Sequence, residues 1–361
     1  MKLQYILFFI NLISINCFIN NNLYKIKISN NNIIKKHIFL NENIQNDVTI
    51  INNNIDYNSN YNNLFKKNNI IKKLKGFLKI IRSNNILPTF VLCLFGGWIN
   101  NPSITNLLSS QQFIVSTITT LLIMSSSMII NDIYDIEVDK INNSNRPLIT
   151  GEVSVKEAIL YAFFLLSFTE FLSLNYLKNN LQWIIHLVIL LINIYTPILK
   201  KILFIKNIFC ASLVSFSIFF TGLSVTNSEL IKNSNFSIAL NLLFFGSLSN
   251  EIILDIRDYD GDKNQNINTI PIIFGKYKAW IFINVLQYFS LIYNSFIFFY
   301  LFNNKISFYY ILIMIPRLTY LYYIKKDNYS KDSISKYMKE TNKTLLLLLS
   351  YLVFLPIFIM F

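Results

Sequence analysis

The stretch "FIVSTITTLLIMSSSMIINDIYDIEVDKINNSNRP", residues 113–147, joins an apolar run to a cluster of four carboxylates. The apolar part, residues 113–130, is long enough to cross most of a bilayer core of about 30 Å as a helix. A charge at the mouth of a membrane helix is costly, and its usual explanation is a functional site. The stretch therefore predicts a transmembrane helix that ends in an acidic site.

The composition is that of a polytopic membrane protein. Hydrophobic residues make up 53% of the 361-residue chain, and charged residues make up only 14%. Apolar runs separated by turn signals recur from residue 84 onward, so we expect an all-α fold with about nine transmembrane helices. Their expected cores are 86–100, 112–130, 156–174, 181–198, 205–225, 236–254, 278–301, 306–324 and 344–361.

Basic residues gather on alternate loops of this arrangement. Nine spans place the loops after the second, fourth, sixth and eighth spans on one face, together with the approach to the first span. The basic residues of that face are Lys140, Arg146, Lys200, Lys201, Lys206, Arg257, Lys263, Lys276, Lys278 and the run from Lys325 to Lys343. The opposite loops contribute single lysines such as Lys178. This asymmetry follows the positive-inside rule, so the net charge of +13 indicates membrane topology and no nucleic-acid partner.

The first 83 residues are expected to form a leader in two parts. Residues 1–19 have a lysine followed by a short apolar core, which is typical of a signal sequence. Residues 20–83 are rich in Asn and Lys and poor in acids, which predicts a disordered, transit-like segment. Such a leader resembles those that direct proteins to secondary plastids, so we expect a plastid membrane. The alternative is a membrane of the endoplasmic reticulum or secretory system. Residues 84–361 form the membrane domain.

The cysteines and histidines indicate no metal or redox site. Cys17, Cys93 and Cys210 lie far apart in the sequence, which predicts neither a disulfide framework nor a zinc site. His37 and His186 are equally isolated. Because His186 lies inside an apolar segment, we expect it to pack or to hydrogen-bond rather than to catalyse.

The carboxylates after the second span share one face of a helix. At 100° per residue, Asn131, Asp135 and Asp139 drift by only about 40° per step and form one oxygen-bearing stripe. Asp132 and Glu137 point away from this stripe. Because the apolar span comes directly before it, we expect the stripe to face the interior of the bundle.

A second acidic cluster, "NEIILDIRDYDGDKNQNINTIPIIFG", follows the sixth span at residues 250–275. Asp258 and Asp262 are again four residues apart, Asp255 and Glu251 extend the same side, and Asp260 falls off it. Two carboxylate stripes without histidine or cysteine suit a hard cation such as Mg²⁺, held together with phosphate oxygens.

Basic residues accompany both stripes. Arg146, Lys200 and Lys263 could neutralise the remaining phosphate charge. The alternative is that the carboxylates are solvated loop charges. Two clusters at the loop ends of apolar spans on the same face favour a functional site.

Four motifs make the chain similar to the UbiA superfamily of intramembrane prenyltransferases. They are "NDIYDIEVD" (131–139), "DYDGD" (258–262), "NRPLITGEVS" (145–154) and "YTPILKK" with a following "KN" (195–207). The likeness extends over the body from about residue 84. It implies nine helices around a central cavity that is capped by the acidic loops, and an enzyme of isoprenoid biosynthesis.

The resemblance also implies a role for each matching residue. The implied metal ligands are Asn131, Asp135, Asp139, Asp255, Asp258 and Asp262. The implied diphosphate-binding residues are Arg146, Lys200, Lys263 and Tyr195, and those with a catalytic role are Asp135, Asp258, Arg146 and Lys263. The donor would be a polyprenyl diphosphate bridged to the carboxylates through Mg²⁺, and the acceptor a lipophilic molecule of the membrane.

The acceptor is the least determined part of this prediction. The stretch 250–275 is most similar to the geranylgeranylglyceryl phosphate prenyltransferases, although Asn250 stands where that branch usually has arginine. The chlorophyll synthase branch also shares motifs with the chain. Within the same class, an aromatic acceptor that leads to a quinone is the alternative. A cation transporter is the alternative from another class, since intramembrane carboxylates also line ion paths.

Overall fold

The computed structural model describes residues 71–226, 234–264, 267–302 and 304–359. All regular elements in these residues are helices. The expected signal sequence and most of the expected transit-like segment lie outside the described residues.

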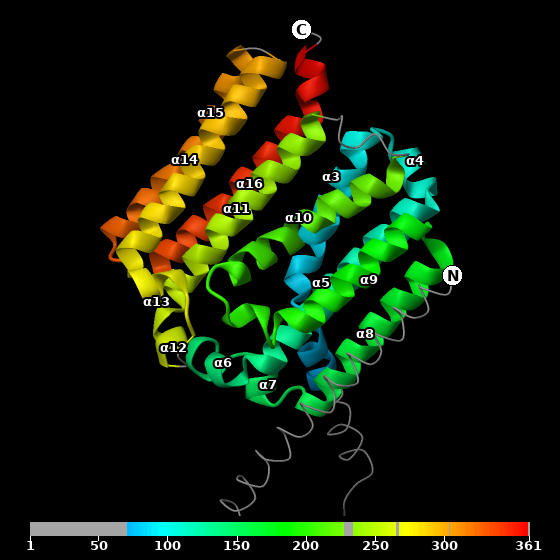
Figure 1. Ribbon diagram of the computed structural model, residues 1–361, viewed down its shortest axis with the longest axis vertical. Coiled ribbons are helices and arrows are strands. Elements are labelled where there is room, and N and C mark those ends of the chain that lie inside the picture. Colours follow the sequence, from blue (N-terminus) through cyan, green and yellow to red (C-terminus); the bar gives the residue numbers. More distant parts are fainter. Residues whose placement is uncertain (1–70, 227–233, 265–266, 303, 360–361) are drawn as a thin grey trace, which may run out of the picture.

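Nine long helices in the described residues form the body of the molecule (Figure 1). They are α3 (Ile86–Asn100), α5 (Gln111–Tyr134), α8 (Val155–Tyr176), α9 (Asn179–Tyr195), α10 (Ile205–Val225), α11 (Ser234–Arg257), α14 (Lys276–Leu301), α15 (Asn304–Lys326) and α16 (Lys331–Ile359). Each one contains one of the nine expected span cores or most of it, which confirms the all-α polytopic fold.

Five of these helices, α5, α8, α10, α11 and α14, are long and apolar enough to cross a membrane without qualification. The segment Ile71–Ile80 and the helical stretch Ser83–Asn100 together give a sixth span with a bend of 49°. The helix α9 has only 17 residues. Polar and charged residues interrupt α15 and occupy the first turns of α16, which explains why these two fall short on hydropathy.

Short helices gather at one end of the bundle. They include α6 (Ile136–Asn142), α7 (Pro147–Thr150), α12 (Tyr259–Asn264) and α13 (Ile270–Phe274), which lie at the lower end in Figure 1. Further short elements are η1 (Ser83–Asn85), α4 (Ile104–Ser109) and η2 (Leu199–Lys201). The two acidic motifs therefore meet at the same end of the molecule, as the loop asymmetry predicts.

Local sequence signals explain the connection from α7 to α8. Pro147 opens α7, where the lack of an N–H costs nothing, and Gly151 ends it in the left-handed region at φ 71°. The helix α8 then starts with a capping box in which Ser154 and Glu157 bond to each other's backbone N–H.

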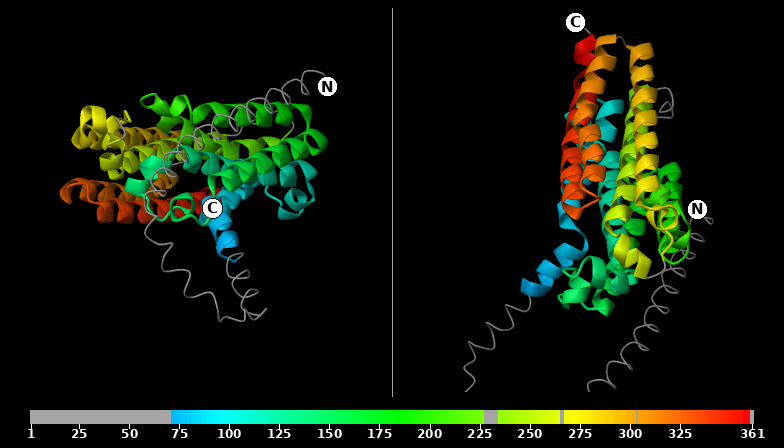
Figure 2. Two further views of the ribbon diagram at one scale, coloured as in Figure 1. Left: turned by 90° about the horizontal axis from the view of Figure 1, so that it is seen from below. Right: turned by 90° about the vertical axis from the view of Figure 1, so that its left-hand side faces the viewer.

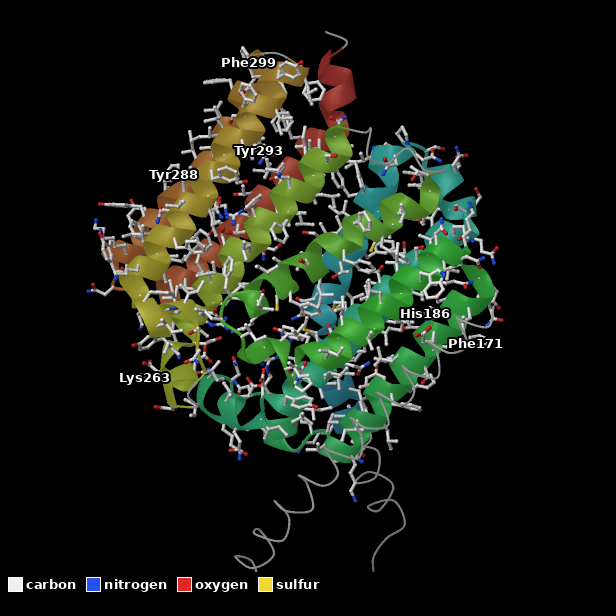
Figure 3. The ribbon with its side chains drawn as sticks, in the orientation of Figure 1. Phe171, His186, Lys263, Tyr288, Tyr293 and Phe299 are labelled. Carbon is white, nitrogen blue, oxygen red and sulfur yellow. The ribbon has the colours of Figure 1, made fainter. Side chains whose placement is uncertain are left out.

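The helix α10 lies at the centre of the bundle, against α3, α5 and α11. At Gly96 of α3, an added Cβ would lie 2.4 Å from the carbonyl oxygen of Ile218 in α10, so a side chain there would push the two helices apart. On the opposite side of the bundle, α14 exposes aromatic side chains, including Tyr288, Tyr293 and Phe299 (Figure 3). Such an apolar outer face is suited to contact with lipid.

The body begins before residue 84. The segment Ile71–Ile80 is helical and leaves the bundle at an angle at the lower end (Figure 2, right). Its last residue, Ile80, is fully buried in the core, and Lys79 bonds to Glu152 at 2.7 Å. The expectation of disorder up to residue 83 is therefore wrong for residues 71–83, because apolar side chains at the end of this basic segment pack on the body.

Candidate active site

A cavity of about 310 Å³ lies between α5, α6, α9, α10, α11 and α12. Its end near α6 and α12 is lined by both acidic motifs. Further from these short helices, the lining becomes apolar, with Ile123 and Met124 from α5 and Leu213, Val214 and Phe216 from α10. The cavity therefore has a charged end at the loops and an apolar end inside the bundle.

The first acidic motif lies across a break between α5 and α6. The helix α5 ends at Tyr134, and α6 begins at Ile136. The backbone N–H of Asp135 and that of Asp139 still bond to the carbonyl oxygens four residues earlier, at 3.0 and 2.7 Å. The expected single helix is therefore interrupted at Asp135, but Asn131, Asp135 and Asp139 all line the cavity.

Lysine and arginine side chains hold the carboxylates of this motif. Lys200 donates to Asn131 Oδ1 at 3.0 Å and bonds to both oxygens of Asp135. Asp139 accepts a bond from Asn143 at 3.0 Å, and Arg146 Nε lies 3.8 Å from its other oxygen. Burial raises the pKa of the Asp139 carboxyl.

The second acidic motif is built in the same way at the junction of α11 and α12. Asp255 accepts bonds from Lys206 at 2.5 Å and from Asn207 at 2.8 Å. Asp258 accepts two bonds of 2.8 Å from the neighbouring Arg257. Asp262 is different, because its Oδ2 is buried and has no hydrogen-bond partner among the described residues. Burial raises the pKa of Asp262 to about 6.

A glycine in the second motif brings the two motifs together. An added Cβ at Gly261 of α12 would lie 2.1 Å from the side-chain oxygen of Asn142 in α6. A larger residue at Gly261 would displace the side chain of Asn142 from its present position. The glycine thus lies at the point where α12 meets a side chain of α6.

The structure places all the predicted site residues at the cavity except Lys263. Arg146, Tyr195 and Lys200 line it together with the six predicted metal ligands. Tyr195 stacks on Phe209 with ring centroids 4.3 Å apart, and its hydroxyl lies 3.2 Å from Cys210 Sγ. The side chain of Lys263 is exposed beside α12, outside the cavity lining (Figure 3).

Several lining residues were not predicted as site residues from the sequence. They are Arg82, Asn142, Asn143, Lys206, Glu251 and Arg257. Arg82 was missed because it lies in the segment that was expected to be disordered, and its φ of 51° turns the chain into α3. Lys206 is the lysine of the "KN" that follows "YTPILKK", so the similarity of that motif could have identified it.

Asp132 lies next to the cavity without lining it. Its side chain is 1% exposed, accepts a 3.1 Å bond from Arg82 and lies 3.8 Å from Arg146 Nη1. As predicted, it points away from the stripe of Asp135. It links the start of α3 to the loop before α7.

In the part of the chain that the structure describes, six carboxylates and five basic side chains line the cavity. The basic ones are Arg82, Arg146, Lys200, Lys206 and Arg257. No group of three or more Asp, Glu, His or Cys side chains in the described residues converges as ready metal ligands. The donors nevertheless fit a hard divalent cation, because they are all oxygens and because Asp262 Oδ2 is buried without a partner.

His186 lies far from this site (Figure 3). Its Nδ1 is 2.7 Å from Oε2 of Glu170, and both side chains are at most 2% exposed between α8 and α9. The structure thus agrees with the prediction that this histidine packs or hydrogen-bonds rather than catalyses.

The model of the UbiA prenyltransferase family matches residues 89–355 of the chain. The chain belongs to this family. Digeranylgeranylglyceryl phosphate synthase of Methanosphaera stadtmanae is 31% identical over 270 residues, which is 73% of this chain and 93% of that protein. The protein of the same name from Saccharolobus solfataricus is 30% identical over 70% of this chain and 88% of its own length.

A solved structure has the same fold. It is a UbiA homolog from Archaeoglobus fulgidus bound to DMAPP and Mg²⁺, with a TM-score of 0.57 and 20% sequence identity. The similarity covers 76% of this chain and 98% of the other. By the family model over residues 89–355 and its apolar helices, the chain is a membrane-embedded prenyltransferase of the UbiA family. Membership of this family excludes the alternative that the protein is a cation transporter.

Proposed function

We propose that this UbiA prenyltransferase transfers an isoprenyl group from a polyprenyl diphosphate to the hydroxyl of a lipophilic glycerophosphate, with Mg²⁺ as cofactor. The names of its archaeal relatives support this acceptor class. The observation that carries the proposal is the single cavity, in which a charged end with both acidic motifs continues into an apolar end.

The cavity fits the two parts of such a donor. The diphosphate would lie at the charged end, where Arg146, Lys200 and Lys206 can donate to its oxygens. The isoprenyl chain would extend past Ile123 and Leu213 into the apolar end. Removal of that chain from water supplies about 0.8 kcal/mol per methylene group, so a longer donor gains affinity as far as the cavity extends.

The metal would be held by Asn131, Asp135, Asp139, Asp255, Asp258 and Asp262. When bound, Mg²⁺ supplies positive charge to the diphosphate as it leaves. Lys200 and Lys206 now bond to Asp135 and Asp255. Both lysines can exchange these carboxylates for phosphate oxygens, which places their charge where negative charge develops.

The transfer releases a proton, and Glu251 is placed to accept it. The allylic C–O bond of the donor breaks with its electron pair on the diphosphate. The acceptor oxygen then forms the new ether bond and loses its proton. Glu251 lines the cavity one turn deeper than Asp255, and within the described residues it forms no ion pair with a lysine or arginine, unlike Asp135, Asp255 and Asp258. A carboxylate without a bound cation is the better proton acceptor.

The test is a product assay with purified protein and Mg²⁺. Labelled prenyl diphosphates of several lengths are incubated with a single-chain glyceryl phosphate ether and, in parallel, with 4-hydroxybenzoate and homogentisate. We expect a prenylated glyceryl ether, identified by mass spectrometry. Prenylation of an aromatic acceptor alone would establish the quinone-precursor alternative, and the absence of any prenylated product would refute the proposal.

We also infer that the leader directs the protein to a plastid membrane. The support is the sequence of residues 1–83, since the archaeal relatives provide none for a plastid. A fluorescent reporter fused to residues 1–80 should reach the plastid, whereas residues 1–25 alone should lead only into the secretory system. A full-length, uncleaved N-terminus in the purified protein would contradict this inference.

A further inference from the structure

We propose a second lipid site, between α11, α15 and α16, that binds the phosphate of an anionic membrane phospholipid at Arg317 and one of its chains along a row of leucines. The site is a narrow cavity of about 40 Å³. It shares no lining residue with the active-site cavity. The proposal therefore does not depend on the donor or the acceptor of the enzyme.

Arg317 is the first observation. Its side chain is on α15 and is 6% exposed. Nε donates to the hydroxyl of Tyr337 at 3.0 Å, and Nη2 donates to Gly246 O at 3.0 Å and to Asn250 Oδ1 at 3.2 Å. These three partners are neutral, and the described residues give the guanidinium no carboxylate. A buried charge without a counter-charge is costly, which favours binding of an anion.

The guanidinium of Arg317 also has N–H donors that remain available for a ligand. An arginine has five N–H donors, and the three bonds of Arg317 leave those of Nη1 without an acceptor in the described residues. Gly246 provides the space, because an added Cβ there would lie 3.2 Å from Nη1. A phosphate or carboxylate oxygen is the partner that such a pair of donors prefers.

Thr341 is the second, independent observation. It lines the same cavity from α16 and is 4% exposed. Its hydroxyl oxygen has no hydrogen-bond partner in the part of the chain that the structure describes. A buried hydroxyl without a partner is destabilising. An anion at Nη1 of Arg317 could accept a bond from this hydroxyl as well, which would satisfy both residues with one ligand.

The polarity of the cavity changes in the same direction along two antiparallel helices. On α11 the lining runs from Asn250 and Ser247 to Leu243, Leu242 and Ala239. On α16 it runs from Thr341 to Leu345, Leu348, Leu349 and Leu352. The lining spans 12 residues on each helix. The eleven steps between the first and the last correspond to about 16 Å at 1.5 Å per step. The polar end is toward the basic face of the molecule, because α11 ends there and α16 begins there (Figure 1).

This gradient matches the way in which a phospholipid stands in a membrane leaflet. The first turns of α16, up to Lys343, are rich in charged residues, which places Thr341 at the depth of the head groups. Basic pockets between helices on this face are suited to anionic head groups. The leucines continue from there into the hydrocarbon layer, where a chain of the same lipid would lie.

The experiment measures the thermal unfolding midpoint of the delipidated protein in detergent. Phosphatidylglycerol, phosphatidylcholine and inorganic phosphate are titrated separately. We expect phosphatidylglycerol to raise the midpoint at a concentration at least about tenfold lower than phosphatidylcholine, because only the former leaves a net negative charge for Arg317. Equal effects of the two lipids would overturn the proposal, and so would an equal effect of inorganic phosphate.

Variants locate the effect. Arg317→Met should weaken phosphatidylglycerol about tenfold or more, since it removes the charged donor. Lys343→Met is the matched control, because it removes the same charge from an exposed position two residues from Thr341, and it should change the affinity by less than about twofold. If Arg317→Met does not fold, two other variants test the site, because both keep the guanidinium. Thr341→Val removes the buried hydroxyl, and Leu349→Trp fills the cavity. Unchanged affinity in both of these would overturn the site.

Discussion

Substitution of Asp135 by Asn tests whether the charge of the first motif serves the reaction. The amide keeps the size of the side chain and one ligand oxygen, and it removes one negative charge. In the structure both oxygens of Asp135 bond to Lys200, and the two side chains are only 16% and 14% exposed. The substitution therefore affects a pair that water screens poorly, and it leaves Lys200 without its carboxylate.

The expected loss is about 10²–10³ in kcat, or roughly 3–4 kcal/mol, which is typical when a group that stabilises transition-state charge is removed. Asp258→Asn should cost less, about ten- to a hundredfold, because Asp258 and Arg257 are 24% and 36% exposed and solvent screens their charges. The double variant should lose less than the product of the two, since both carboxylates serve one metal and one diphosphate.

Asp260→Asn is the matched control within the second motif. Asp260 is exposed and does not line the cavity, so its loss of charge should change kcat by less than about twofold. The assay measures prenyl transfer at saturating Mg²⁺ with equal amounts of folded protein, checked by size-exclusion chromatography. A control as damaging as Asp135→Asn would refute the assignment of the stripes. So would an Asp135→Asn enzyme within a few-fold of the wild type.

Three further predictions concern residues around the two motifs. Arg82→Gln should lower the free energy of unfolding by about 1–3 kcal/mol, because the buried Asp132 loses its 3.1 Å partner; chemical denaturation measures this, and an unchanged value would contradict it. Glu251→Gln should lower the rate of prenyl transfer about 10²-fold or more without loss of donor binding, whereas Cys210→Ser should change that rate by less than about threefold. Rapid-quench kinetics separates the rate of transfer from donor binding. A Glu251→Gln enzyme with normal activity would exclude Glu251 as the proton acceptor. Without metal, the pKa of Asp262 is about 6, above its unfolded value of about 3.9, so its contribution to stability is present below pH 4 and is lost as the pH rises through 6. Because Mg²⁺ requires the ionised form, its affinity should fall up to about tenfold per pH unit below 6, with proton release measurable by calorimetry in buffers of different ionisation enthalpy.

Hydropathy and charge asymmetry were sufficient to predict the nine long helices and the common face of the acidic motifs. Hydropathy is read within each span and charge asymmetry is summed over the loops, so both can be evaluated without knowledge of tertiary contacts. Helical periodicity also placed Asn131, Asp135 and Asp139 correctly at the cavity. It did so although the helix is interrupted at Asp135, because the break keeps the backbone bonds that carry the four-residue spacing.

The partners of the carboxylates could not be predicted in the same way. Arg82 lies 50 residues before Asp132, in a segment whose composition predicts disorder. The burial of Ile80 and the bond from Lys79 to Glu152 reveal that this segment belongs to the body. The contact of Gly261 with Asn142 is also a tertiary feature, since it depends on how closely α12 approaches α6. Lys263 was expected at the site because it is next to an acidic motif in the sequence, but its side chain does not line the cavity.

The near balance of acidic and basic side chains around the cavity has a consequence for the order of binding. With Lys200 on Asp135 and Lys206 on Asp255, the resting site is an internal salt. A bare dication would have to compete with two ammonium groups, and a bare diphosphate would meet six carboxylates. If Mg²⁺ and the diphosphate bound together, Asp135 and Asp255 would face the metal while Lys200 and Lys206 faced the phosphate oxygens, so the total charge of the site would hardly change. We therefore expect metal and donor to strengthen each other's binding, and the empty site to bind either ion alone more weakly than both together.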